Sequence, residues 1–104
     1  MIMTGLLQGR PMGLYTIVVD FRGGTYFEQV SAEDLNSAVA EWPSRAPVDA
    51  MGLLSTTKSQ LLDMVRDPDA DPTPLRGLRN VWTVALLLED STAFLNIIKT
   101  STDP

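Results

Sequence analysis

Hydrophobic and polar residues alternate in the first part of the chain in the manner of β-strands. The runs LYTIVVDF (residues 14–21) and TYFEQVS (residues 25–31) are rich in β-branched and aromatic residues. Gly23 and Gly24 lie between them, and glycine readily adopts the positive φ angles that tight turns require. The pattern therefore predicts a β-hairpin.

The register of this hairpin depends on its turn. A one-residue bulge brings Phe27 and Gln29 to the side of the main apolar stripe. Without a bulge, Glu28 lies on that side. In either register a polar side chain therefore lies beside the apolar stripe, and we interpret its position as a sheet margin where that side chain reaches water. A turn at Gly23 and Gly24 predicts three cross-strand pairs: Phe21 with Tyr26, Val19 with Glu28, and Ile17 with Val30.

The segment SAEDLNSAVAEWP (residues 31–43) carries the signals of an amphipathic helix. Ser31 is a suitable N-cap, Asp34 stands at the capping-box position, and Pro43 forbids continuation. The predicted buried face follows the helical period and consists of Leu35, Ala38, Val39 and Trp42. This helix is expected to lie across the apolar side of the hairpin.

A second helix is predicted in STTKSQLLDMVRD (residues 55–67). Ser55, Thr56 or Thr57 supplies its cap. Its apolar face consists of Leu61, Met64 and Val65, with Leu62 at the border.

The last segment predicts a second hairpin, with strands at about 80–89 and 92–100 and a turn at Asp90 and Ser91. Both of its faces are apolar, as in strands that are covered on both sides. One face carries Trp82, Val84, Leu86, Leu88, Ala93, Leu95 and Ile97, and the other carries Val81, Ala85, Leu87, Phe94 and Ile98.

These elements predict an α+β fold of order ββααββ, in which two hairpins form a four-stranded antiparallel sheet with two helices mainly on one face. The second face then needs another cover, and a second copy of the chain supplies it most simply because most soluble oligomers are two-fold homodimers. The alternative is a monomer whose helices lie one on each face. We expect residues 1–12 to be a disordered lead and residues 13–104 to form one domain.

Composition narrows the function. The 104 residues include no Cys and no His, which removes thiolate chemistry, the commonest general base and the usual zinc ligands. The net charge is −5. The nearest approach to a basic cluster is Arg76 and Arg79, so we do not expect nucleic acid as a partner. The sequence has no apolar run long enough to span a membrane, so we do not expect a membrane as a partner either. We expect a cytoplasmic protein without a cofactor.

Two sequence features suggest chemistry without supporting it. The spacing of Asp67, Asp69 and Asp71 is similar to a calcium loop, but prolines at its second and sixth positions and Leu78 in place of the bidentate Glu break the EF-hand pattern. Paired acids such as Glu33-Asp34 are explained by helix-start chemistry. No residue is assigned a catalytic or metal-binding role, and whether the chain is an enzyme stays open, with the sequence favouring a non-enzyme.

The run YTIVVDFRGGTYFEQVSAEDLNSAVAEW (residues 15–42) resembles the start of HicB-type antitoxins, small bacterial proteins in which a glycine-containing hairpin precedes a helix. The resemblance covers about a quarter of the chain. The PDLPGC-like third-strand segment of such proteins is missing, and no DNA-binding helix or arm follows. We therefore transfer no function and no residue role.

The favoured function is a non-enzymatic protein-interaction module, such as a small bacterial adaptor, antitoxin-like or immunity-like protein, that forms a homodimer or binds another protein through an apolar sheet face. The candidate interface consists of Trp82, Leu86, Leu87, Phe94 and Ile98. The alternative is a small-ligand-binding or catalytic domain with a pocket between the first hairpin and the first helix. That pocket would be lined by Tyr15, Tyr26, Glu28 and Trp42.

Overall fold

The structure, a computed structural model, describes residues 12–54 and 57–102 of the 104-residue chain. This part contains one antiparallel sheet, two α-helices and a short 3-10 helix. In chain order the elements are β1 (Gly13–Phe21), β2 (Gly24–Ala32), α2 (Leu35–Arg45), α3 (Thr57–Arg66), η2 (Pro68–Ala70), β3 (Thr73–Pro74), β4 (Val81–Leu88) and β5 (Ser91–Thr102). The predicted α+β class is confirmed. The predicted lead, residues 1–12, lies outside the described residues except for Met12.

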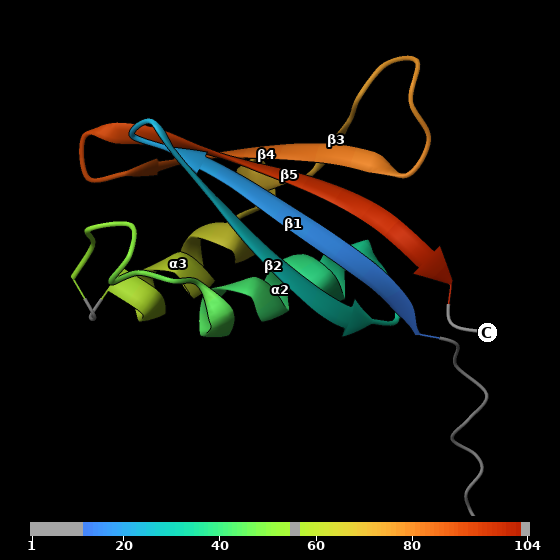
Figure 1. The fold of residues 1–104 in the computed structure, drawn as a ribbon, viewed down its shortest axis with the longest axis horizontal. Coiled ribbons are helices and arrows are strands. Elements are labelled where there is room, and N and C mark those ends of the chain that lie inside the picture. Colours follow the sequence, from blue (N-terminus) through green and yellow to red (C-terminus); the bar gives the residue numbers. More distant parts are fainter. Residues whose placement is uncertain (1–11, 55–56, 103–104) are drawn as a thin grey trace, which may run out of the picture.

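The sheet has five strands in the order β2-β1-β5-β4-β3, not the predicted four (Figure 1). The two hairpins join through β1 and β5, which pair antiparallel. The additional strand, β3, pairs only Thr73 with Thr83 and Pro74 with Trp82. Proline has no backbone N–H, which is why it is confined to sheet edges. A strand of two residues is also too short to show the alternating pattern by which strands are predicted.

Both hairpins turn one residue earlier than predicted. Arg22 and Gly23, with φ of 50° and 80°, form the first turn, so Phe21 pairs with Gly24 and not with Tyr26. In the second hairpin Leu88 pairs with Ser91, and the turn consists of residues 89–90. Moving a two-residue turn by one position shifts each cross-strand partner by two residues, and side chains two apart share a face. The predicted turn positions are therefore wrong, whereas the predicted assignment of residues to the two faces of each hairpin is correct.

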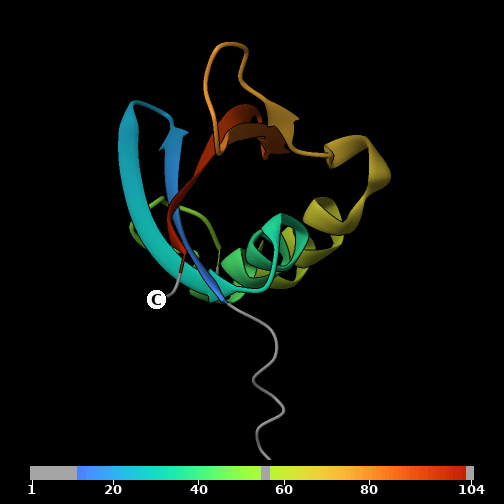
Figure 2. The same cartoon turned by 90° about the vertical axis from the view of Figure 1, so that its right-hand side faces the viewer.

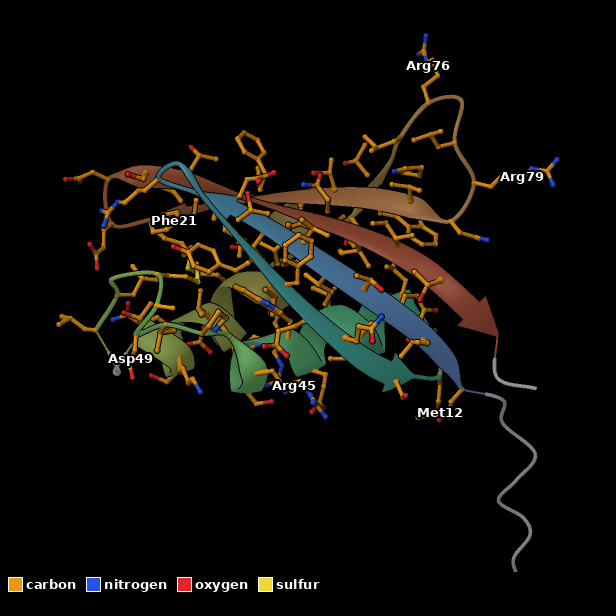
Figure 3. All side chains as sticks on the ribbon, in the orientation of Figure 1. Met12, Phe21, Arg45, Asp49, Arg76 and Arg79 are labelled. Carbon is orange, nitrogen blue, oxygen red and sulfur yellow. The ribbon has the colours of Figure 1, made fainter. Side chains whose placement is uncertain are left out.

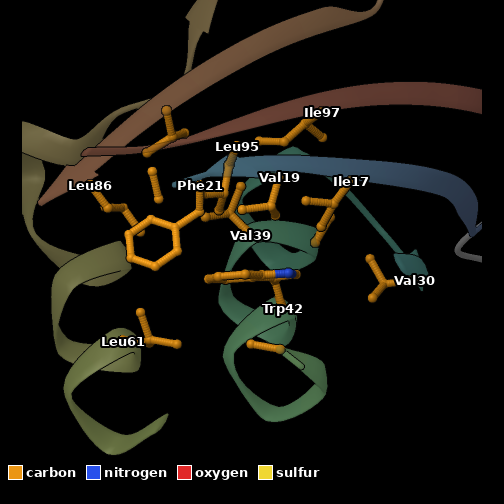
Figure 4. Packing of buried hydrophobic residues seen from close by; sticks show 14 of the residues in the cluster. Ile17, Val19, Phe21, Val30, Val39, Trp42, Leu61, Leu86, Leu95 and Ile97 are labelled. Carbon is orange, nitrogen blue, oxygen red and sulfur yellow. The ribbon is translucent and has the colours of Figure 1, made fainter. Parts of the chain in front are cut away.

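Helices α2 and α3 lie on the same side of the sheet, which we call the inner face (Figures 1 and 2). Figure 4 shows Trp42 of α2 lying flat beneath Val19 and Ile17 of β1, with Leu61 of α3 beside it. These side chains are fully buried. The core also takes in the inward-facing positions of β4 and β5, which are Val84, Leu86, Leu88, Ala93, Leu95 and Ile97.

The boundaries of α2 differ from the prediction at both ends. Its N-cap is Asp34, whose Oδ1 accepts a hydrogen bond from the Ser37 backbone N–H at 2.8 Å, while Ser31 is still part of β2. The helix also continues through Pro43 to Arg45. Proline in a last turn forfeits only a hydrogen bond or two, and Pro43 is buried, which offsets part of that cost. The predicted second helix is confirmed as α3, with Leu61 buried. Thr57 is its first helical residue and not its cap, and the other two candidate caps, residues 55 and 56, lie outside the described residues.

Candidate functional site

The opposite side of the sheet, which we call the outer face, exposes large apolar side chains to water. Phe27 of β2 is 67% exposed, Leu87 of β4 65% and Phe94 of β5 48%. The register places Phe27 opposite Val18 and Phe94 opposite Ala85. No described helix lies on this face (Figure 2). Apolar patches on small monomers are usually limited, and contiguous ones mark interaction surfaces.

An uncharged polar ladder crosses one end of the outer face. Gln29 Nε2 donates to Thr16 Oγ1 at 3.0 Å, and Thr16 Oγ1 donates to Thr100 Oγ1 at 3.4 Å. Thr100 Oγ1 in turn donates to the backbone oxygen of Leu14 at 3.0 Å. Because these groups already bond to one another, covering this end of the face with a partner would leave few of them unsatisfied.

The outer face is nearly free of charge. From residue 13 to residue 100, Asp20 is the one charged side chain that the strands β1, β2, β4 and β5 place there. Its Oδ1 accepts from Thr25 Oγ1 at 3.0 Å and its Oδ2 from Asn96 Nδ2 at 3.4 Å. Lys99 pairs with Tyr15 and is directed to the other side. Depletion of charge together with exposed aromatic residues is the composition of an interface core.

The five predicted interface residues are divided between the two faces. Leu87, Phe94 and Ile98 lie on the outer face, as the alternation requires. Leu86 is only 4% exposed and belongs to the core, and Trp82 is half-buried against that core on the inner face. Neighbouring strand residues such as 86 and 87 point to opposite sides, so the set as a whole cannot form one surface.

The outer face also includes residues that sequence reasoning did not name as interface candidates. Phe27 is its most exposed aromatic residue, and Val18 lies directly opposite. The signal that identifies them is the alternation itself, because Ile17, Val19 and Phe21 face inward and their neighbours must face outward. This signal was ambiguous in the sequence, because the bulged register would place Phe27 on the same side as Ile17, Val19 and Phe21.

The residues of the predicted pocket lie on the inner face but in a filled region. Tyr15 is 3% exposed and Trp42 is fully buried, so both contribute to the core. Tyr26 Oη donates to the backbone oxygen of Ala50 at 3.2 Å, which ties the loop after α2 to this side of the sheet. Glu28 is half-buried. Burial raises the pKa of the Tyr15 phenol, and the nearby Asp34 carboxylate raises it further.

Other features of the described residues offer little for chemistry. The indole Nε1–H of Trp42 is buried without a hydrogen-bond partner among them. A surface hollow of about 310 Å³ between α2 and the segment after α3 is lined in part by Val39, Arg66 and Asp71, and by none of the predicted pocket residues. In the described ranges no three His, Cys, Asp or Glu side chains gather as metal ligands.

The loop between β3 and β4 carries Arg76 and Arg79, which point away from the sheet in Figure 3. Leu78 between them is exposed, and Gly77 takes the positive φ of 84° that the turn requires. Neither arginine has a salt bridge within the described part of the chain. Both are therefore solvated charges, as the sequence predicts.

Within the described ranges, neither α-helix combines the length and the apolar character that a membrane crossing requires. No protein-family model, curated protein or solved structure matches this chain. Its function is therefore inferred from its own surface.

Proposed function

We propose that the chain is a non-enzymatic protein-interaction module that self-associates through the outer face of its sheet. The observation that supports this most directly is the exposure of Phe27, Leu87 and Phe94 on one side of a sheet whose other side is closed by both helices. Covering these side chains with the same face of a second copy removes apolar area from water on both copies.

The chemistry of the face favours a protein partner. An interface core is rich in aromatic residues and poor in charge, and here Asp20 carries the charge while Thr25 and Asn96 already satisfy its carboxylate. A two-fold arrangement brings each residue of the face against the same face of the other copy. Like charges there would repel, so the scarcity of charge suits self-association in particular.

The test replaces one exposed leucine of the face by a charge. Leu87→Asp should weaken self-association by about 30-fold or more in Kd, since an apolar side chain that an interface buries tightly is worth roughly 2 kcal/mol or more there. Leu54→Asp is a stringent neighbouring control, because Leu54 is 71% exposed and lines a surface hollow together with Leu87 but lies in a loop and on no strand of the outer face. Light scattering across a dilution series measures the mass of both variants and of the wild type.

The expected result is that the wild type and Leu54→Asp share one assembled mass, while Leu87→Asp dissociates with an unchanged circular dichroism spectrum. A wild type that has the mass of one chain at every concentration contradicts self-association. A Leu87→Asp variant that keeps the wild-type mass shows that the outer face is not the contact.

A further inference from the structure

The two edges of the sheet differ in how they are protected. At one edge, β3 has two residues, and one of them is Pro74, which removes a backbone donor. At the other edge, β2 has nine residues (Gly24–Ala32) and pairs with β1 on one side only (Figure 2). Natural sheets protect exposed edges with proline, lysine, bulges or very short strands. The described β2 has no proline, no lysine and no bulge against β1.

The hairpin turn determines which backbone groups of β2 are unused. Arg22 and Gly23 both have positive φ, which is the type I′ turn, and the residues that close such a turn form a hydrogen-bonded pair. Phe21 and Gly24 are that pair. Counting along the strand by twos, the N–H and C=O groups that point away from β1 belong to Thr25, Phe27, Gln29 and Ser31.

We propose that the β2 edge pairs antiparallel with the β2 edge of a second copy of the chain, about a two-fold axis at Phe27. The unused groups of four alternate residues form a regular row, which is the template that another strand requires. The pairing extends the sheet of each copy into one continuous sheet. It is a second interface, separate from the outer-face contact, and it does not depend on that contact.

The sequence of β2 is complementary to itself in this register. Phe27 lies opposite Phe27 of the second copy, and Thr25 lies opposite Gln29, all on the outer face. On the inner face Tyr26 lies opposite Glu28, so the two Glu28 carboxylates are not directly opposed. A two-fold axis at Glu28 would oppose them, and like charges directly across a strand pair are destabilising.

Edge pairing also joins the two outer faces side by side. The two Phe27 side chains, each 67% exposed in the single chain, then meet at the centre of one wider surface. Aromatic pairs across neighbouring strands are favourable by roughly 0.2–1 kcal/mol. If the outer faces also pair as proposed above, two such extended sheets form a closed assembly of four chains with two kinds of two-fold contact.

The test removes one edge donor and leaves the outer-face contact intact. Gln29→Pro deletes an outward N–H and places the proline ring where the second strand would lie, a position at which an edge strand of a single chain tolerates proline. Gln29→Ala is the matched control, since it removes the same side chain and its hydrogen bond to Thr16 but keeps the N–H. Light scattering gives the masses, and circular dichroism verifies the fold.

We expect Gln29→Pro to halve the assembled mass and Gln29→Ala to leave it unchanged. If both contacts exist, Leu87→Asp alone also halves the mass, and the double variant is a single chain. A Gln29→Pro variant that folds and retains the wild-type mass overturns edge pairing. Retention of mass by Leu87→Asp overturns the outer-face proposal instead, so the two failures are distinguishable.

A second measurement on the wild type decides the question even where Gln29→Pro fails to fold. Amide hydrogen exchange of residues 25, 27 and 29, which pair across the proposed two-fold axis, should slow by about 10-fold or more when over ~90% of chains are paired, and the protection should vanish on dilution. The amides of residues 26, 28 and 30, which face β1, should stay protected throughout. Fast exchange of the amides of residues 25, 27 and 29 at high concentration, or protection that survives dilution to single chains, overturns the proposal.

Discussion

The two faces of the sheet are built from the same strands and have opposite surroundings. On the inner face, every second residue of β1 from Tyr15 to Phe21 is closed off by α2, α3 and the loop between them. On the outer face the intervening residues meet water, although β4 and β5 place Leu87 and Phe94 there. The hydrophobic pattern alone does not distinguish the faces of β4 and β5. The helices do, because both of them lie on one side (Figure 2).

The comparison shows what an apolar strand position indicates in a short chain. Inside the fold such a residue contributes to stability because neighbours from other elements fill the space around it. The same residue on a bare face contributes little to the single chain, and its apolar area becomes favourable only when another molecule covers it. Substitutions on the two faces should therefore affect different equilibria.

The largest expected effect comes from emptying the core. Trp42→Ala should lower the free energy of unfolding by about 3–5 kcal/mol, because the side chain is fully buried and leaves a cavity. Phe94→Ala, on the outer face, should change the unfolding of dilute single chains by less than about 1 kcal/mol and weaken association instead. Urea denaturation at low concentration measures the first quantity, and light scattering measures the second.

A loss of 3 kcal/mol or more for Phe94→Ala in dilute protein would contradict this separation of the faces. Phe94 would then be a stability residue of the single chain despite its exposure. Leu95→Ala is a useful companion, since Leu95 is the next residue of β5 and is fully buried on the inner face. It should behave like Trp42→Ala.

The division of the strand residues between two faces could be predicted from the sequence, because it depends only on whether two residues are an even or an odd number of positions apart. Both turns were predicted one position late, yet the residues that share a side stayed together, as in the set Val84, Leu86 and Ala93. The turns were missed because Arg22 and Glu89, with φ of 50° and 58°, occupy positions where glycine or asparagine is the usual choice. A hydrogen-bonded salt bridge joins these two residues, and sequence shows neither its presence nor its geometry.

What parity cannot show is which elements cover which side. The placement of both helices on one face depends on packing between distant segments, and it decides that Leu87 is open while Leu86 is buried. The predicted interface combined Leu86 and Leu87, which lie on opposite faces, because both are apolar and the sequence does not show which face the helices cover. The edge strand β3 was missed for a local reason, since Thr73 and Pro74 are too few to show a period.

A smaller effect is expected where the two hairpins meet at the end of the sheet, a place that belongs to neither face. Arg22 Nη2 lies 3.2 Å from Glu89 Oε1, and Arg22 Nε donates to Ser91 Oγ at 3.0 Å. The Arg22 guanidinium also stacks on the Phe21 ring, 4.8 Å from its centroid. A double-mutant cycle of Arg22→Ala and Glu89→Ala should give a coupling of about 0.2–1 kcal/mol, since the pair is exposed.

The same two variants should leave the assembled mass unchanged, because neither side chain lies on the outer face or on the β2 edge. A coupling near zero would mean that water replaces this contact without loss. A change of mass would mean that the sheet end takes part in association, which would undermine the assignment of association to the outer face.

The smallest effect at neutral pH is expected at Tyr15, at the margin of the inner face. Burial first, and the Asp34 carboxylate second, raise the pKa of its phenol above the ordinary value. Both the folded and the unfolded chain keep this phenol neutral at pH 7, so Tyr15→Phe should change the pH dependence of stability there hardly at all. Above the unfolded value of about 10, the unfolded chain loses the proton first, and stability falls as pH rises through the folded pKa.

Urea midpoints between pH 7 and pH 11 measure this loss, and Tyr15→Phe should remove the part of it that Tyr15 causes. Asp34→Asn tests the second cause, because asparagine caps a helix about as well as aspartate but carries no charge. It should reduce the alkaline loss without abolishing it, since burial of Tyr15 is the larger cause. If Tyr15→Phe loses stability above pH 10 as steeply as the wild type, the Tyr15 phenol is solvated. The inner face would then be open to water at this margin.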